Sequence, residues 1–116
     1  MPPMPSSFFH LIVYVPLSHA DAVRTALAEA GAGKIGAYDH CSFSMRGTGR
    51  FRPLAGAKPS IGTVGKIEEV EEERIEVVVL SENLPKVIRA VRKIHPYEEP
   101  AIHILPMLGE SDVANL

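Results

Sequence analysis

Apolar and polar residues follow a pattern along the first part of the chain that predicts a strand and then a helix. Phe8–Val15 is rich in β-branched and aromatic residues, which predicts a strand, and Pro16 ends it. Ser18 with Asp21 is typical of a capping pair at the start of a helix. Apolar residues then recur at i, i+3, i+4 and i+7, on one helix face: Val23, Ala26, Leu27 and Ala30. We expect this helix to end at Gly31, because glycine is common just beyond a helix C-terminus.

The middle of the chain predicts extended structure on either side of an acidic turn. Short extended pieces are expected around 40–45 and 49–53, within a glycine-rich segment. The stretch 61–70 predicts a strand, and 74–80 predicts another. The three glutamates between them, at 71–73, are interpreted as a solvated turn, so the two strands would form a hairpin.

A second helix and a last strand complete the pattern. Pro85 suits the first turn of a helix, and Pro96 forbids its continuation. Its buried stripe again has helical spacing: Leu84, Val87, Ile88 and Val91. The stretch 101–105 predicts the final strand. The order predicts an α+β fold, a ferredoxin-like βαββαβ sandwich. Its antiparallel four-stranded sheet would carry two helices on one face, with a glycine-rich insertion after the first helix.

The strands carry apolar residues on both of their faces. In the first strand Phe9, Leu11 and Val13 share one side, while Ile12 and Tyr14 share the other. Two helices can cover only one face, and a large exposed apolar patch is rare in a monomer. We therefore expect self-association through the sheet. The alternative is that the glycine-rich segment folds over the second face.

Length, charge and cysteine content restrict the class of protein. The 116 residues predict one domain at 8–106, with a disordered N-terminus at 1–7 and a loose tail at 107–116. The net charge of −2 does not favour nucleic acid or an anionic membrane. No apolar run is long enough to span a bilayer, and the N-terminus does not resemble a secretory signal. A single cysteine, Cys41, suits a reducing compartment, so a cytoplasmic location is expected.

Eight of the nine glycines fall between 31 and 65. Such clustering marks turns or a close approach to a ligand. The stretch 31–36 matches G-x-G-x-x-G, but the dinucleotide fingerprint must follow a strand and open a helix. Here the motif follows a helix, so we interpret it as a helix end with a glycine turn.

Basic residues within the glycine-rich segment make anion binding a hypothesis. Glycine amides and arginines can hold a phosphate or carboxylate, although these arginines could instead pair with the glutamates at 68–73. A cleft between subunits would form where this segment meets the turn 95–100, His-Pro-Tyr-Glu-Glu-Pro. The candidate ligand-binding residues are Gly33, Lys34, Gly36, Tyr38, Arg50, Arg52, Tyr97 and Glu98.

Binding of a divalent metal is a second hypothesis. The candidate ligands are His40, Cys41, His95 and His103. Adjacent strand positions point to opposite faces, so neighbouring residues do not easily chelate one ion. These side chains could equally cap, pack or face solvent. An enzyme is a third possibility, but no nucleophile beside a base is recognisable, and no catalytic residue is assigned.

Four long motifs carry a family resemblance. They are the segments 31–44 (GAGKIGAYDHCSFS), 47–53 (GTGRFRP), 70–76 (VEEERIE) and 95–100 (HPYEEP). Together they closely resemble the domain inserted in some Nif-three-like proteins (the NGG-interacting-factor family, YqfO type). The His-Pro-Tyr-Glu turn also resembles that of CutA, the divalent-cation-tolerance protein. The resemblance covers about residues 8–106.

This resemblance implies an assembly but no activity. The inserted domain looks like CutA and the PII signalling proteins, whose ferredoxin-like units associate as trimers. Full-length Nif-three-like proteins carry a two-metal site in flanking domains that have no counterpart in these 116 residues, so that site and any hydrolase activity are not carried over. We expect a non-catalytic homo-oligomer that binds a small molecule and neither nucleic acid nor membrane.

Overall fold

A computed structural model describes residues 7–113 of the chain. Residues 1–6 and 114–116 lie outside the described residues, and with them most of the predicted disordered N-terminus and the end of the predicted loose tail. Within residues 7–113 the elements are β1 (Phe8–Pro16), α1 (Leu17–Glu29), β2 (Phe43–Phe51), β3 (Glu68–Leu80), η1 (Ser81–Asn83), α2 (Leu84–Ile94), β4 (Ile102–Met107) and η2 (Glu110–Asp112).

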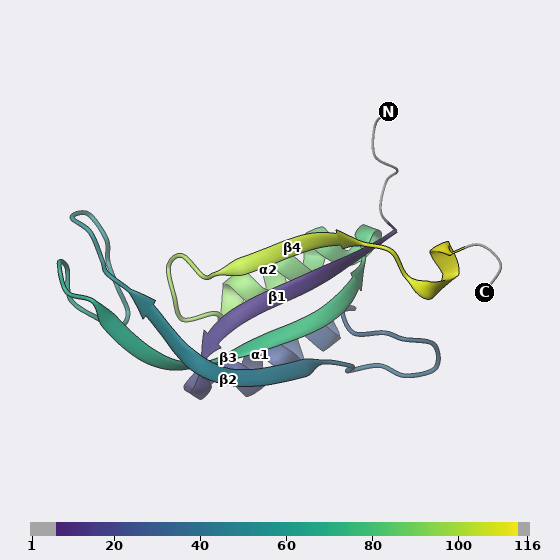
Figure 1. The fold of residues 1–116 in the computed structure, drawn as a ribbon, viewed down its shortest axis with the longest axis horizontal. Coiled ribbons are helices and arrows are strands. Elements are labelled where there is room, and N and C mark those ends of the chain that lie inside the picture. Colours follow the sequence, from purple (N-terminus) through teal and green to yellow (C-terminus); the bar gives the residue numbers. More distant parts are fainter. Residues whose placement is uncertain (1–6, 114–116) are drawn as a thin grey trace, which may run out of the picture.

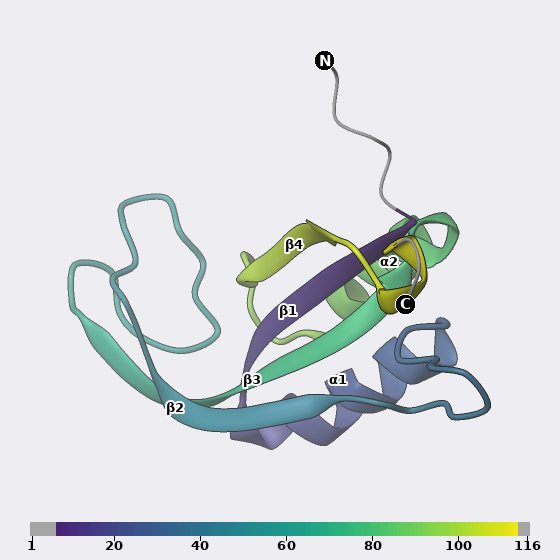
Figure 2. The ribbon, with the colours of Figure 1, turned by 45° about the vertical axis from the view of Figure 1, so that its right-hand side comes forward.

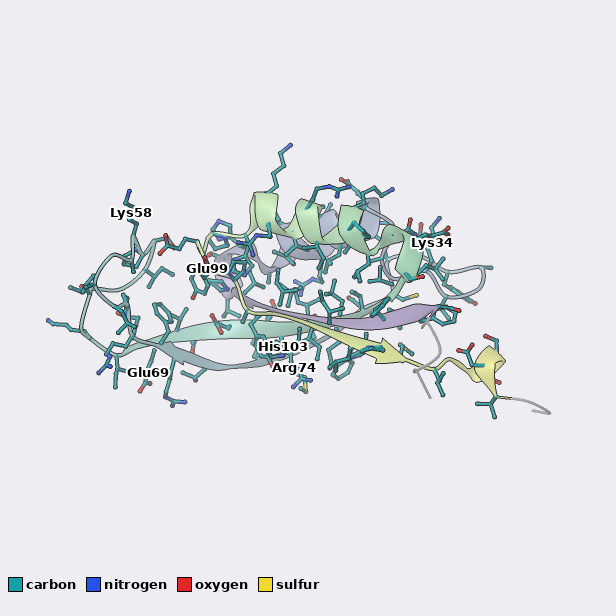
Figure 3. The ribbon with its side chains drawn as sticks, turned by 90° about the horizontal axis from the view of Figure 1, so that it is seen from above. Lys34, Lys58, Glu69, Arg74, Glu99 and His103 are labelled. Atoms are coloured by element: carbon teal, nitrogen blue, oxygen red, sulfur yellow. The ribbon has the colours of Figure 1, made fainter. Side chains whose placement is uncertain are left out.

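The strands form one antiparallel sheet in the order β2-β3-β1-β4. In Figure 1 the helices α1 and α2 lie behind the sheet, and seen from above they cover the same face (Figure 3). This arrangement is the predicted ferredoxin-like α+β fold, which is confirmed. Among the described residues, no helix has the length and apolar character needed to cross a membrane.

The core lies between the sheet and the helices. Alternate residues of the central strands point to the helices and are fully buried, and the apolar stripes predicted for the helices meet them. Its largest fully buried side chains are Leu11, Val13, Val15, Val23, Leu27, Ile75, Val79, Val87 and Val91. Burial of these side chains supplies the main driving force for folding.

The predicted hairpin between 61–70 and 74–80 is wrong. β3 runs without interruption through the glutamates, and its hairpin partner is β2, with Arg46 opposite Glu73 and Arg50 opposite Glu69. One glutamate of the acidic run, Glu73, has basic side chains beside it within the folded chain. Arg24 of α1 donates a hydrogen bond to Glu73 at 2.7 Å, which ties the strand to the helix.

The β2–β3 hairpin extends beyond the rest of the sheet. β1 pairs with β3 only as far as Pro16, which lies opposite Glu72. Residues 68–71 of β3 therefore have a strand partner on one side only, and Figure 2 shows this end of the hairpin with the loop that follows β2 standing clear of β4.

The ends of the helices agree only in part with the sequence predictions. α1 begins at Leu17 without a side-chain cap, so the predicted capping pair is wrong: Ser18 hydrogen-bonds His19, and Asp21 pairs with Arg24. Gly31 does end the helix, with φ +107, a conformation that glycine adopts without strain.

Within residues 7–113, no helix covers the second face of the sheet (Figures 1 and 3). Exposed apolar side chains occupy it on both edge strands: Phe43 is 61% exposed, Met45 46% and Leu105 49%. Figure 3 places Lys58, in the loop after β2, on the helix side of the sheet, whereas Arg74 and His103 lie on the other side. We call this surface, around Ile12, Arg74 and Leu105, the open face.

Candidate functional site

A cavity lies where the extended hairpin faces the turn between α2 and β4. Its volume is about 560 Å³. The wall combines the end of β1, the loop 52–61 and the turn 97–101. The lining residues are Tyr14, Arg50, Phe51, Arg52, Pro53, Leu54, Ala57, Pro59, Ser60, Ile61, Glu72, Tyr97, Glu98, Glu99, Ala101 and His103. We call this cavity the hairpin pocket.

Glu72 is a buried carboxylate in the wall of this pocket. Glu72 is only 8% exposed. Its Oε2 accepts a hydrogen bond from the Tyr97 hydroxyl at 3.0 Å. Among the described residues Oε1 has no hydrogen-bond partner, and no basic side chain forms an ion pair with Glu72. A second hollow of about 190 Å³ beside the pocket also includes Glu72.

Gly49 creates the space that this carboxylate occupies. A Cβ at Gly49 would overlap Oε1 and Cδ of Glu72, whereas a Cβ at Gly47 would meet nothing within 4 Å. Glycine inside a strand often marks a close approach of another group to the backbone. The glycine at 49 therefore lets Glu72 lie flat across β2.

His95 fixes the turn that carries Tyr97. The residue is 7% exposed. Its Nε2 donates a hydrogen bond to the Tyr14 carbonyl at 2.7 Å, and its Nδ1 accepts one from the Tyr97 backbone N–H at 3.1 Å. Burial lowers the pKa of His95, and the hydrogen bond to Tyr14 and the nearby Glu72 offset this only in part. The imidazole is therefore neutral at pH 7 and does not balance the charge of Glu72.

Tyr97 keeps its proton because it is partly buried and hydrogen-bonded to a carboxylate. Burial raises its pKa, and the hydrogen bond to Glu72 raises it further, because an ionised phenol beside a carboxylate is unfavourable. Its ring meets the edge of Phe51 with centroids 5.6 Å apart, and on the other side of the pocket Tyr14 meets His103 at 5.4 Å. Four aromatic rings thus line the pocket together with Glu72.

The arginines and Glu98 of the pocket have different surroundings. Arg50 Nε lies 3.5 Å from Glu69 Oε1, and both side chains are more than 60% exposed, so this ion pair is weak. Arg52 is exposed and, among the described residues, forms no ion pair. Glu98 Oε1 accepts the backbone N–H of Lys58 at 3.0 Å, which joins the loop to the turn and closes the pocket at that point.

Half of the candidate ligand-binding residues lie in this pocket and half do not. Arg50, Arg52, Tyr97 and Glu98 line it. Figure 3 shows Lys34 at the opposite end of the molecule from Lys58.

The candidates at that opposite end have structural contacts of their own. The Gly33 N–H donates to the Val78 carbonyl at 2.8 Å, and Gly36, with φ +57, makes the tight turn that joins Ile35 to Tyr38. No anion cradle therefore forms from the Gly33 amide, which is already bonded.

The candidate metal ligands are not gathered into one centre. Within residues 7–113, no group of three or more His, Cys, Asp or Glu side chains is placed to hold an ion. His40 and Cys41 line a small hollow beside α1, whereas His103 lines the hairpin pocket. Both ring nitrogens of His95 are already hydrogen-bonded.

Glu72, Tyr14 and Phe51 line the pocket but are not among the site residues predicted from the sequence. Glu72 belongs to the acidic run 71–73, whose composition predicts a solvated turn and not a buried carboxylate. One signal was available: Gly49 interrupts a strand whose partner is that acidic run. Gly49 lies opposite Val70, two positions along β2 from Gly47, which is the partner of Glu72, and a glycine inside a strand indicates a close approach of another group to the backbone.

Comparison with known proteins gives relatives over nearly the whole chain. No protein-family model matches it. The "GTP cyclohydrolase 1 type 2 homolog" of Halalkalibacterium halodurans is 45% identical over 115 residues, which cover 99% of this chain and 31% of that protein. The protein of the same name from Bacillus subtilis is 53% identical over 97 residues, which cover 84% of this chain and 26% of that protein. The chain thus spans less than a third of the length of these relatives.

Solved structures similar to this chain include proteins of the same kind as these sequence relatives. A Bacillus cereus protein related to NIF3 is 43% identical with a TM-score of 0.77, covering 92% of this chain and 27% of that one. The periplasmic divalent cation tolerance protein CutA from Archaeoglobus fulgidus is 24% identical with a TM-score of 0.61. The match covers 86% of this chain and 83% of that one.

The fold is therefore that of a CutA-like, ferredoxin-like domain. By sequence, the chain is related to one segment of the NIF3-related, YqfO-type proteins, and the resemblance predicted from its motifs is confirmed.

Proposed function

We propose that the chain is a non-catalytic, oligomeric binding module that holds a small anion or metabolite in the hairpin pocket. The observation that carries this proposal is the cavity itself. Its volume of about 560 Å³ lies within the usual range for small-molecule sites, and its wall is largely apolar with a few polar groups. The exposed Arg50 and Arg52 are available to an anionic group of the ligand.

We further propose that copies of the chain associate through the open face. The exposed Phe43, Met45 and Leu105 support this, because burial of such side chains drives association. The resemblance to CutA implies a trimer. In such an assembly the hairpin pocket, which shares Tyr14 and Glu72 with the hollow on the open face, would lie beside a neighbouring subunit.

A panel of ligands tests the pocket. Protein purified without an affinity tag is examined by native mass spectrometry for retained molecules, and its thermal unfolding is followed with nucleotides, small acids and divalent metals. GTP belongs in the panel because the relatives are named GTP cyclohydrolase 1 type 2 homologs. We expect at least one organic compound to raise the melting temperature.

A matched pair of variants locates the effect. Ala57 lines the pocket, whereas Ala55 lies in the same loop, exposed and outside it. Ala57→Trp fills the cavity and should abolish the ligand-induced rise, while Ala55→Trp should retain it. An unchanged melting temperature across the whole panel would contradict the proposal, and a rise with metals alone would favour the CutA-type metal-binding alternative.

A further inference from the structure

The Glu72 carboxylate has one oxygen, Oε1, that receives no hydrogen bond from the described residues. A charged group taken out of water is costly unless hydrogen bonds or an opposite charge replace the water. Tyr97 donates a hydrogen bond to Oε2, whereas Oε1 lies beside Gly49, and the residue lines both the hairpin pocket and the hollow next to it.

The nearby basic groups do not fill this role. The His95 ring is neutral and has both nitrogens engaged. The Arg74 guanidinium lies toward Glu76, with Nη2 at 3.6 Å from Oε1 of that residue, and over the Tyr14 ring at 5.9 Å. The residues that line the pocket include three glutamates and two arginines, so the lining offers acceptors for the hydrogen-bond donors of a ligand as well as partners for an anionic group.

We infer that Glu72 is the recognition group of the hairpin pocket, and that it selects a flat heteroaromatic ligand with adjacent N–H donors, such as an amino-substituted nitrogen ring. This inference rests on the proposed function and narrows its ligand class. Aromatic rings of Tyr14, Phe51, Tyr97 and His103 provide walls for a flat ring. A carboxylate accepts hydrogen bonds and donates none, so the ligand must bring the donor.

The test compares two ring compounds of nearly the same shape. 2-Aminobenzimidazole carries adjacent N–H donors, and 2-methylbenzimidazole replaces the amino group by a methyl group. 1-Naphthoate is the anionic third compound. Binding is followed by amide chemical-shift changes of Gly49, Phe51 and Tyr97, which also report the place of binding. We expect the amino compound to bind at least about tenfold more tightly than the methyl compound, because hydrogen bonds to a charged group are the stronger ones.

Variants assign the preference to one carboxylate. Glu72→Gln should bring the two ring compounds to within about threefold of each other. Glu71→Gln, at an exposed position next to it on the same strand, should leave the preference unchanged. Gly49→Ala is a second variant that tests the same carboxylate. The added Cβ displaces the Glu72 carboxylate without removing it, so this variant should also lose the preference for the amino compound.

The outcomes separate this inference from the proposed function. Equal binding of the two ring compounds, or a preference that survives in both Glu72→Gln and Gly49→Ala, would overturn the role of Glu72 while leaving a ligand pocket in place. If none of the three compounds shifted the pocket amides, and the thermal panel also failed, the pocket itself would be rejected.

Discussion

Single residues in this chain position groups that lie far from them in the sequence. Gly49 has no side chain, and the Glu72 carboxylate occupies the space that a Cβ would take. Tyr97 arrives from the turn after α2 and donates to the same carboxylate. The position of the carboxylate therefore depends on three segments.

Alanine at two neighbouring glycines of β2 tests this arrangement. Gly49→Ala should displace the carboxylate and deprive Tyr97 of its acceptor, so it should lower the free energy of unfolding by about 1–3 kcal/mol more than Gly47→Ala. Urea denaturation followed by circular dichroism measures both values. Equal losses in the two variants would show that Glu72 does not lie on Gly49.

The buried His95 gives stability a defined pH dependence. Burial lowers its pKa in the folded chain, so below about pH 6.5, the ordinary histidine value, the unfolded chain binds the proton more readily. Above about pH 6.5, His95 therefore has no effect on the pH dependence of the unfolding free energy. As the pH falls from about 6.5 toward the lower pKa of the folded chain, the unfolding free energy decreases. His95→Gln should show a smaller loss of unfolding free energy between pH 7 and 5 than the wild type.

The control for this prediction is His40→Gln, since His40 is exposed. Its pH profile should follow that of the wild type. A wild-type slope retained in His95→Gln would assign the acid sensitivity to another group.

At the level of elements, the acidic run is held in β3 by basic partners. The Arg24–Glu73 pair joins α1 to the strand, and its side chains are 28% and 13% exposed. The Arg50–Glu69 pair on the same hairpin has 62% and 63% exposure. Burial distinguishes the two pairs, so their energetic contributions should differ.

Double-mutant cycles with alanine measure that difference. We expect a coupling energy of at least about 1 kcal/mol for Arg24 with Glu73, because the hydrogen bond is charge-assisted and partly shielded from water. For Arg50 with Glu69 we expect about 0.5 kcal/mol or less, as for exposed ion pairs. Equal couplings would mean that the Arg24 contact does not hold the strand to the helix.

Periodicity was enough to predict the fold, because apolar spacing reports directly which side of an element is buried. The register of β3 was not predictable in this way. Its glutamates resemble a solvated turn until Arg24, Arg46 and Tyr97, from distant segments, are placed beside them.

Only part of the site was predicted, because the sequence does not show which distant segments meet in the fold. Arg50, Arg52, Tyr97 and Glu98 belong to two motifs that do meet in space. Gly33 and Lys34 lie in the same glycine-rich segment, but β2 carries the chain away from them across the length of the molecule, as Figure 3 shows. A short sequence separation therefore gave a false indication of proximity.

At the scale of the whole molecule, the open face is the feature that the fold leaves without a cover. The sheet carries its helices on one face, and Phe43 and Leu105 lie exposed on the other. Ile12, at its centre, is 4% exposed, so neighbouring side chains cover that point and leave the edge strands as the apolar surface.

A charge placed on this surface should prevent association. Leu105→Glu introduces a carboxylate that would have to be buried between copies, at a cost that an interface does not tolerate without a partner. Ile67→Glu is the control, since Ile67 is 72% exposed and precedes β3 at the far end of the hairpin. Size-exclusion chromatography with light scattering should show a smaller mass for Leu105→Glu only. The same reduction in both variants would point to the hairpin end instead.

Sedimentation velocity of the wild-type chain at about micromolar concentration tests the central claim most directly, since the claim is that copies of the chain cover one another's open faces. The account predicts a single species with the mass of an oligomer. A stable species with the mass of one chain, unchanged on raising the concentration, would contradict it.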